Sequence, residues 1–92
     1  MAKKELNIYD EIRKNNENGK AILGLERTIK ELKKSNLSKV YISSNCAKDV
    51  IEDLEYYASL QSIELIKLEI PNDELGIICK KPFSVSVLGI LK

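Results

Sequence analysis

The side chains with the most evident chemical capacity stand together in Ser43-Ser44-Asn45-Cys46, between an apolar stretch and a segment with helical periodicity. A thiol at a helix start can act as a nucleophile if its pKa is lowered, and a strand-to-helix junction offers unpaired backbone N–H groups at the positive end of the helix dipole. Two interpretations of Asn45 stay open on local grounds. Its side chain either caps the following helix or donates to and accepts from a base edge.

Catalysis has little support elsewhere in the chain. The sequence has no histidine, which removes the commonest general base near neutral pH. It also lacks the G-x-G-x-x-G and G-x-x-x-x-G-K-[ST] patterns of nucleotide-binding loops. The two cysteines, Cys46 and Cys79, lie far apart without C-x-x-C spacing, so we expect small half-buried thiols rather than a zinc site, and a disulfide stays open. We therefore expect no enzyme, no cofactor, no metal and no small-molecule substrate.

Length and composition favour one small domain. The chain has 92 residues, of which 43% are hydrophobic and 32% charged, values typical of a modest core in a soluble protein. No apolar run approaches the roughly 20 residues that a bilayer span needs, and the first residues lack the apolar segment of a secretory signal. We expect a single domain over residues 1–92, located in the cytoplasm and not associated with a membrane.

The charges are unevenly distributed, although the net charge is only +1. Residues 20–48 contain seven basic and two acidic side chains, a local charge of +5, whereas residues 49–74 contain eight acidic side chains and one lysine, a local charge of −7. A polyanion would approach the first segment and avoid the second, although such runs also occur simply as solvated helix faces.

Hydrophobic periodicity predicts alternating helices and strands. Apolar residues recur every three or four positions from Ala47 to Ala58, which is the clearest helix. Asn7 is a candidate cap of the first helix, and Asn72 or Asp73 of the last. The apolar phase slips between Leu65 and Ile66, which indicates either a bulge or burial on both faces. Helices are expected at about 8–16, 25–35, 47–58 and 72–79, and strands at 20–23, 39–43, 63–70 and 85–91.

This order predicts a three-layer α/β/α sandwich with a central four-stranded mixed sheet. The loops that leave the carboxyl ends of parallel strands gather at one edge of such a sheet, and ligands bind there. We expect Gly24, the Ser43–Cys46 junction, Pro71–Asp73 and the Lys80–Ser84 loop to meet at that edge. Tyr9, Tyr41 and Tyr57 are expected to pack in the core, with Tyr56 at a layer boundary.

Four segments carry a resemblance to a known family: LGLERTIKEL (23–32), SSNCAKDVIEDLEYYA (43–58), NDELG (72–76) and KPFSVSVLGIL (81–91). Together they closely resemble the L-thirty-e proteins of the large ribosomal subunit in archaea and eukaryotes, within the wider kink-turn-binding group that includes L-seven-Ae. The resemblance runs in register from about Leu6 to Leu91. It implies an α/β/α fold that binds a kinked internal loop of rRNA through the loops at one end of the sheet.

The resemblance also implies roles for individual residues. Gly24 would let the start of the second helix approach the RNA backbone, and Arg27 and Lys30 would present basic side chains to RNA. Glu26 belongs to the same set of RNA-binding candidates. Asn45 matches an RNA-contacting asparagine of the family. The apolar loop that packs on an extruded nucleotide corresponds to Phe83, Ser84 and Val85.

The role of Phe83 stays open. Pro82 stiffens the approach to Phe83, which suits a side chain held out for contact, whereas the alternation of Phe83, Val85 and Val87 suits the buried face of a strand.

The L-seven-Ae branch has an Asn-Glu pair after its equivalent of Gly24, whereas this chain has Glu26-Arg27 there. This difference favours the L-thirty-e branch.

The expected partners follow from the resemblance. They are rRNA with a kink-turn-type internal loop and other large-subunit ribosomal proteins, and we expect a monomer when the protein is free. The alternatives are an L-seven-Ae-like kink-turn binder in a non-ribosomal ribonucleoprotein, or a protein-interaction relative that has lost RNA binding and docks through its acidic third helix.

Overall fold

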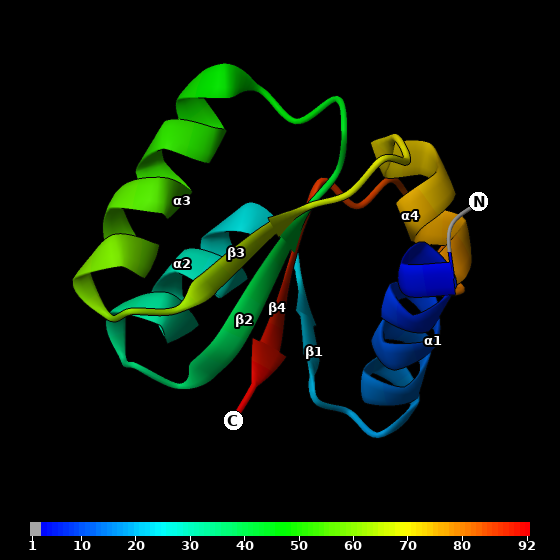
Figure 1. Cartoon of the computed structure of the whole chain (residues 1–92), viewed down its shortest axis with the longest axis horizontal. Coiled ribbons are helices and arrows are strands. Elements are labelled where there is room, and N and C mark those ends of the chain that lie inside the picture. Colours follow the sequence, from blue (N-terminus) through cyan, green and yellow to red (C-terminus); the bar gives the residue numbers. More distant parts are fainter. Residues whose placement is uncertain (1–2) are drawn as a thin grey trace.

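Four helices and one four-stranded sheet make up the part of the chain that the computed structural model describes, residues 3–92 (Figure 1). The helices and strands alternate along the sequence, as the periodicity predicts. In chain order the elements are α1 (Lys3–Glu17), β1 (Ala21–Leu23), α2 (Leu25–Lys33), β2 (Leu37–Ile42), α3 (Lys48–Leu60), β3 (Glu64–Lys67), α4 (Asn72–Ile78) and β4 (Val87–Leu91).

The sheet is mixed, with the strand order β1-β4-β2-β3. The last strand, β4, lies between β1 and β2 and is antiparallel to both, whereas β2 and β3 are parallel. The ends of β1, β2 and β3 therefore lie at the same edge of the sheet as the start of β4. This arrangement confirms the expected sandwich and brings the predicted loops to one end.

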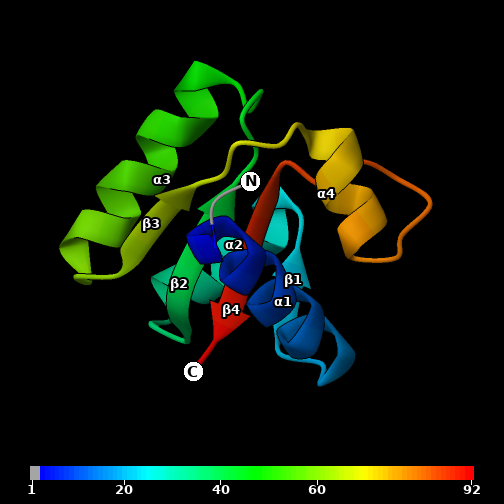
Figure 2. The ribbon, with the colours of Figure 1, turned by 45° about the vertical axis from the view of Figure 1, so that its right-hand side comes forward.

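Helices cover both faces of the sheet, which gives three layers. Figures 1 and 2 show α2 and α3 on one side and α1 and α4 on the other. One apolar cluster lies under α1 and α4 and includes Tyr9, Tyr41 and Leu75, and a second lies under α2 and α3 and includes Leu32 and Leu54. The placement of Tyr9 and Tyr41 in the core is confirmed, and Tyr57 packs against the second cluster.

The predicted caps of the first and last helices were wrong. Helix α1 begins at Lys3, so Asn7 lies inside it and does not cap it. Pro71 precedes α4 without a side-chain cap, and the Asp73 side chain accepts instead from the neighbouring backbone N–H of Glu74. Proline is tolerated at a helix start because its missing N–H has no intrahelical acceptor there.

Two strands are shorter than predicted. The strand expected at 63–70 comprises only Glu64–Lys67, and its pairing with β2 has no register shift, so the bulge at Leu65 and Ile66 is not present. The alternative is confirmed, because Leu65 packs against the cluster on one face and Ile66 against the cluster on the other. The strand expected at 85–91 begins at Val87.

Tyr56 also departs from its predicted place. Its side chain is 61% exposed, with its ring edge-to-face against Tyr57, rather than at a layer boundary.

Candidate nucleic-acid interface

Backbone hydrogen bonds draw three chain junctions together at one end of the sheet. Gly24, between β1 and α2, donates its N–H to the carbonyl of Val87 at 3.0 Å. Ser43, just after β2, donates to the carbonyl of Ser86 at 2.9 Å, and Ser44 donates to Ile70 at 2.8 Å. The junctions after β1 and β2 therefore meet the start of β4, and the junction after β3 meets the one after β2, at the edge that the sheet topology predicted.

Asn45 is the centre of a side-chain network at this end. Its Oδ1 accepts from the Ser43 hydroxyl at 3.1 Å and from the backbone N–H of Asn72 at 2.9 Å, and its Nδ2 donates to Oδ1 of Asn72 at 3.1 Å. Asn72 in turn donates through its own Nδ2 to the Ser86 hydroxyl at 3.2 Å, and its carbonyl accepts from the Val85 N–H at 3.0 Å. One residue pair thus joins the β2–α3, β3–α4 and α4–β4 connections.

The capping interpretation of Asn45 is therefore wrong for α3. Ala47 occupies the cap position of that helix, and no side chain caps it. Asn45 instead binds the first N–H of α4, a helix that lies later in the chain. An amide nitrogen has two donor hydrogens. One of them serves Asn72, so the exposed Asn45 side chain retains a second N–H that can donate to a ligand.

A groove of about 410 Å³ opens beside this network. Its walls come from the junctions after β1 and β2 and from the loop that enters β4. Gly24, Leu25, Cys46, Ala47, Phe83, Ser84 and Ser86 are among its lining residues. None of its lining side chains carries a carboxylate, so the groove itself offers no negative charge that would repel a phosphate.

Phe83 and Val85, both at the rim of this groove, differ in how far they are exposed to solvent. Phe83 is 56% exposed and precedes the strand, so the interpretation that it begins the buried face of β4 is wrong. Val85 is 2% exposed and belongs to the cluster under α1 and α4. Its side chain packs in the core, although Val85 also lines the groove, so the RNA contact implied for it stays a prediction. Ser84 lies between them and is exposed.

Gly24 is required for its backbone conformation. Its φ of 98° lies in the region that residues with a Cβ rarely adopt, whereas a Cβ built there would meet nothing within 4 Å. The glycine supplies no side-chain cap to α2, and the first N–H groups of a helix have no acceptor within it. The start of α2 therefore leaves room and backbone donors for an approaching anion.

The charged residues of α2 lie beside the groove rather than in it. Glu26, Arg27 and Lys30 are all exposed. Arg27 and Lys30 line a separate shallow hollow of about 240 Å³ together with Ile22 and Glu31. The structure therefore brings Gly24, Asn45, Phe83 and Ser84 to one end of the sheet and places the two cations on the adjoining helix.

The cysteines do not support nucleophilic chemistry. Burial raises the pKa of the Cys46 thiol, although a backbone hydrogen bond from Ala47 partly opposes this effect. Burial likewise raises the pKa of Cys79, which packs in the cluster on the other face of the sheet. Both cysteines are free thiols. A raised pKa keeps a thiol protonated near neutral pH, which is the opposite of what an activated cysteine needs.

Sequence reasoning placed Asn72 at this edge, within Pro71–Asp73, and considered it as a helix cap. It missed the pairing of Asn72 with Asn45 and gave Ser86 no role. The available signal was a pair of polar residues, Ser84 and Ser86, on either side of the predicted strand start at Val85. However, the partners of Asn72, which are Asn45 and Ser86, lie 27 and 14 positions away along the chain. Only the fold shows that they meet.

The comparisons with known proteins agree with this architecture. Residues 6–92 match the model of the ribosomal protein L7Ae/L30e/S12e/Gadd45 family. The "large ribosomal subunit protein eL30" of Methanocaldococcus jannaschii is 38% identical over 89 residues, which cover 97% of this chain and 81% of that protein. The protein of the same name from Methanothermobacter thermautotrophicus is 44% identical over 72 residues, 78% of this chain and 74% of that protein.

Solved structures share the fold at low sequence identity. A Giardia lamblia 15.5 kDa RNA-binding protein superposes with a TM-score of 0.85 at 14% identity, covering 95% of this chain and 72% of that one. A Bacillus halodurans protein of unknown function gives a TM-score of 0.79 at 17% identity, covering 85% and 77%.

The named relatives are ribosomal proteins rather than enzymes, in agreement with the expectation of a non-enzymatic chain. With a family match that spans nearly the whole sequence, and with relatives of 38% and 44% identity, the chain belongs to the ribosomal protein L7Ae/L30e/S12e/Gadd45 family and is similar to the archaeal eL30 proteins within it.

Proposed function

We propose that this chain is a protein of the large ribosomal subunit whose residues 1–92 act as one rRNA-binding domain, and that it binds a kinked internal loop of the kink-turn type. The observation that carries the proposal is the Asn45–Asn72–Ser86 network, which holds three loops around a groove between Gly24 and Phe83. The similarity to archaeal large-subunit proteins supports the ribosomal location in the cytoplasm and neighbours among other large-subunit proteins.

Each part of the site suits one feature of a kinked RNA loop. Such loops expose unstacked bases, which proteins bind by stacking and by hydrogen bonds to base edges. The exposed ring of Phe83 can stack on an extruded base, and the second N–H of Asn45 can donate to a base acceptor. Ser84 adds an exposed hydroxyl, and the Glu26 carboxylate can accept from a base amino group.

The RNA backbone would lie along the start of α2. Gly24 leaves room there, and the free N–H groups of the first helical turn can donate to a phosphate. Arg27 and Lys30, which share the adjoining hollow, add two cations. The phosphates would then lie beside α2, within the segment 20–48 that carries a local charge of +5.

Titration with two RNAs tests the proposal. One is a synthetic hairpin with a kink-turn, and the other is the same hairpin with the internal loop replaced by Watson–Crick pairs. We expect the dissociation constant for the paired RNA to be about 1 μM or weaker, typical of non-specific binding, and that for the kink-turn to be far lower. Equal affinity for both RNAs would refute loop recognition.

Salt dependence separates this proposal from a relative that binds only proteins. Affinity for the kink-turn RNA should fall steeply with salt as counterions are released. Crosslinking in native lysate then identifies the RNA, and recovery of a large-subunit rRNA loop distinguishes the ribosomal role from a role in another ribonucleoprotein.

A further inference from the structure

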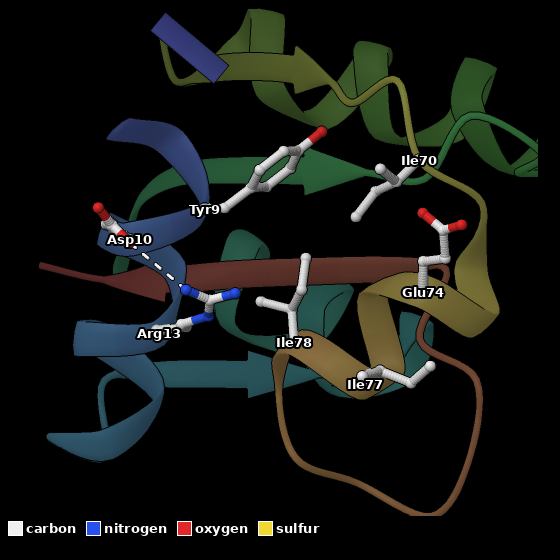
Figure 3. A pocket seen from close by; sticks show the side chains of 7 residues that line it. All are labelled: Tyr9, Asp10, Arg13, Ile70, Glu74, Ile77 and Ile78. Atoms are coloured by element: carbon white, nitrogen blue, oxygen red, sulfur yellow. Dashed lines mark hydrogen bonds and ion pairs between the residues drawn. The ribbon is translucent and has the colours of Figure 1, made fainter. Parts of the chain in front are cut away.

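A second concave site lies between α1 and α4, away from the groove described above (Figure 3). Its volume is about 300 Å³. Tyr9 comes from α1, Ile70 from the segment before α4, and Ile77 and Ile78 from α4. Charged residues stand around these apolar side chains: Asp10, Arg13 and Glu74. The close-up shows Ile78 between the two helices, with Arg13 and Glu74 on either side of it.

The size and lining of this pocket suit one apolar side chain. Its volume is at the lower end of the range for small-molecule pockets, so it has little room for a larger ligand. Ile77 is 73% exposed, which is unusual for an isoleucine on a folded helix. A partner that covered Ile77 and filled the pocket would remove this apolar surface from water.

The charges around the pocket select the chemistry of the partner. Arg13 is already paired with Asp10 at 3.5 Å, whereas Glu74 makes no ion pair among the described residues. Glu69 and Asp73, next to Ile70 and Glu74 in the chain, are exposed as well. Glu74 attracts cations, which favours a lysine or arginine in the partner.

We propose that the α1–α4 pocket is a docking site for a basic segment of another protein, which inserts one large apolar side chain between the helices and places a lysine or arginine on Glu74. This site goes beyond the proposed RNA interface and shares no lining residue with the groove, although Ile77 also lines a hollow that reaches Phe83 and Ser84. The protein would thus hold RNA at the sheet end and a cationic polypeptide beside α4.

Methyl NMR of the full chain with synthetic peptides tests this proposal. The probes are short Lys/Arg-rich peptides with a central leucine or phenylalanine, the same peptides with a central serine, and leucine peptides in which glutamate replaces the basic residues. We expect the methyl signals of Ile70, Ile77 and Ile78 to shift with the first set. The serine peptides should bind about tenfold more weakly, as expected on loss of an anchor residue, and the acidic peptides should not bind.

Matched variants connect the binding to the pocket. Ile77→Ser and Glu74→Gln should each weaken the basic leucine peptide severalfold. Leu60→Ser and Glu55→Gln, at exposed positions on α3, should leave its affinity unchanged. Shifts that are absent or map elsewhere, equal binding of the serine peptides, or single-stranded RNA that shifts the same methyl signals would each overturn the proposal.

The RNA titration provides an independent control. Glu74→Gln should not weaken the affinity for kink-turn RNA, since the Glu74 side chain takes no part in the Asn45–Asn72–Ser86 network. The peptide experiment contains no RNA, so a failure of the RNA proposal and a failure of the docking proposal produce different results.

Discussion

Asn45 and Asn72 bind each other reciprocally: Oδ1 of Asn45 accepts from the Asn72 backbone N–H at 2.9 Å, and Nδ2 of Asn45 donates to Oδ1 of Asn72 at 3.1 Å. The pair makes α4 dependent on a side chain from the β2–α3 junction. It also fixes the orientation of the Asn45 amide, because the oxygen is occupied twice and only one N–H remains free. The side chain proposed to bind RNA is thereby positioned before RNA arrives.

Asn45→Asp should therefore reduce both stability and RNA affinity. An aspartate keeps the acceptor for Asn72 N–H but places a second oxygen against Oδ1 of Asn72. We expect a loss of about 1 kcal/mol in the free energy of unfolding, the usual net worth of one hydrogen bond. RNA affinity should fall by a further ~1–3 kcal/mol, because the free N–H is lost and a negative charge is added.

Urea denaturation and RNA titration measure the two effects separately. Asn18→Asp is the matched control, because Asn18 is exposed near the opposite end of the sheet and the substitution adds the same charge. If Asn45→Asp binds RNA as tightly as the control, Asn45 has no role in RNA contact.

The network also shows where sequence reasoning reached its limit. The amphipathic period of residues 47–58 depends on neighbouring positions, so α3 and the layered fold could be predicted. The partner of Asn45 lies 27 positions away, and an asparagine before a helix is locally indistinguishable from a cap of that helix. The sheet edge was predictable from strand order, but the contact within it was not.

Phe83 and Val85 illustrate a second limit. The alternation of Phe83, Val85 and Val87 indicates one strand face only if all three residues are in a strand. However, β4 begins at Val87, and the Val85 N–H donates to the Asn72 carbonyl at 3.0 Å. Phe83 and Val85 therefore lie outside the strand, and the strand rule of alternating faces does not apply to them. The loop turns Val85 inward and leaves Phe83 outside.

Phe83→Ala should weaken RNA binding with little loss of stability. The side chain is 56% exposed, so its removal leaves no core cavity. A stacked base is worth ~1–3 kcal/mol, and we expect RNA affinity to fall by that amount. Tyr56→Ala removes a similarly exposed ring on α3 and should not change RNA affinity. Binding isotherms beside thermal melts decide the matter, and equal affinities of the two variants would refute stacking on Phe83.

Val85→Ala should show the opposite behaviour. This residue is 2% exposed within the core, so we expect a loss of about 1–3 kcal/mol in unfolding free energy from lost burial and the cavity left behind. RNA affinity should be unchanged once it is corrected for the folded fraction. A loss of affinity without a loss of stability would contradict this prediction and support the direct contact between Val85 and RNA that the family resemblance implied.

Arg27→Gln combined with Lys30→Gln should weaken binding to any RNA. If both cations meet phosphates, the slope of log affinity against log salt should fall by roughly 1.5 units. Lys14→Gln with Lys20→Gln is the matched control, since both lysines are exposed and lie near the far end of the sheet. Equal slopes for the two double variants would place the RNA away from α2.

Glu11→Gln should change how the free energy of unfolding depends on pH in the alkaline range. The Glu11 carboxylate accepts from Lys39 Nζ at 2.6 Å, and this hydrogen bond raises the pKa of Lys39 above its ordinary value of 10.5, although desolvation opposes it. A pKa raised by folding contributes stability below the unfolded pKa, and that stability is lost as the pH rises through the folded pKa. The wild type should therefore be more stable than Glu11→Gln at pH 7 and lose this advantage above about pH 10.

The advantage at pH 7 should be no more than about 1 kcal/mol, because the Lys39 and Glu11 side chains are 30% and 41% exposed and solvent screens the pair. Burial raises the pKa of Tyr41 as well, and the Glu11 charge adds to this effect, so both proteins should weaken at high pH and their difference reports on Lys39 and Tyr41 together. Urea melts at pH 7 and through the alkaline range measure that difference. Glu17→Gln, which disrupts the more exposed 3.7 Å pair with Lys80, should produce almost no change, and a constant gap between wild type and Glu11→Gln at every pH would contradict the linkage.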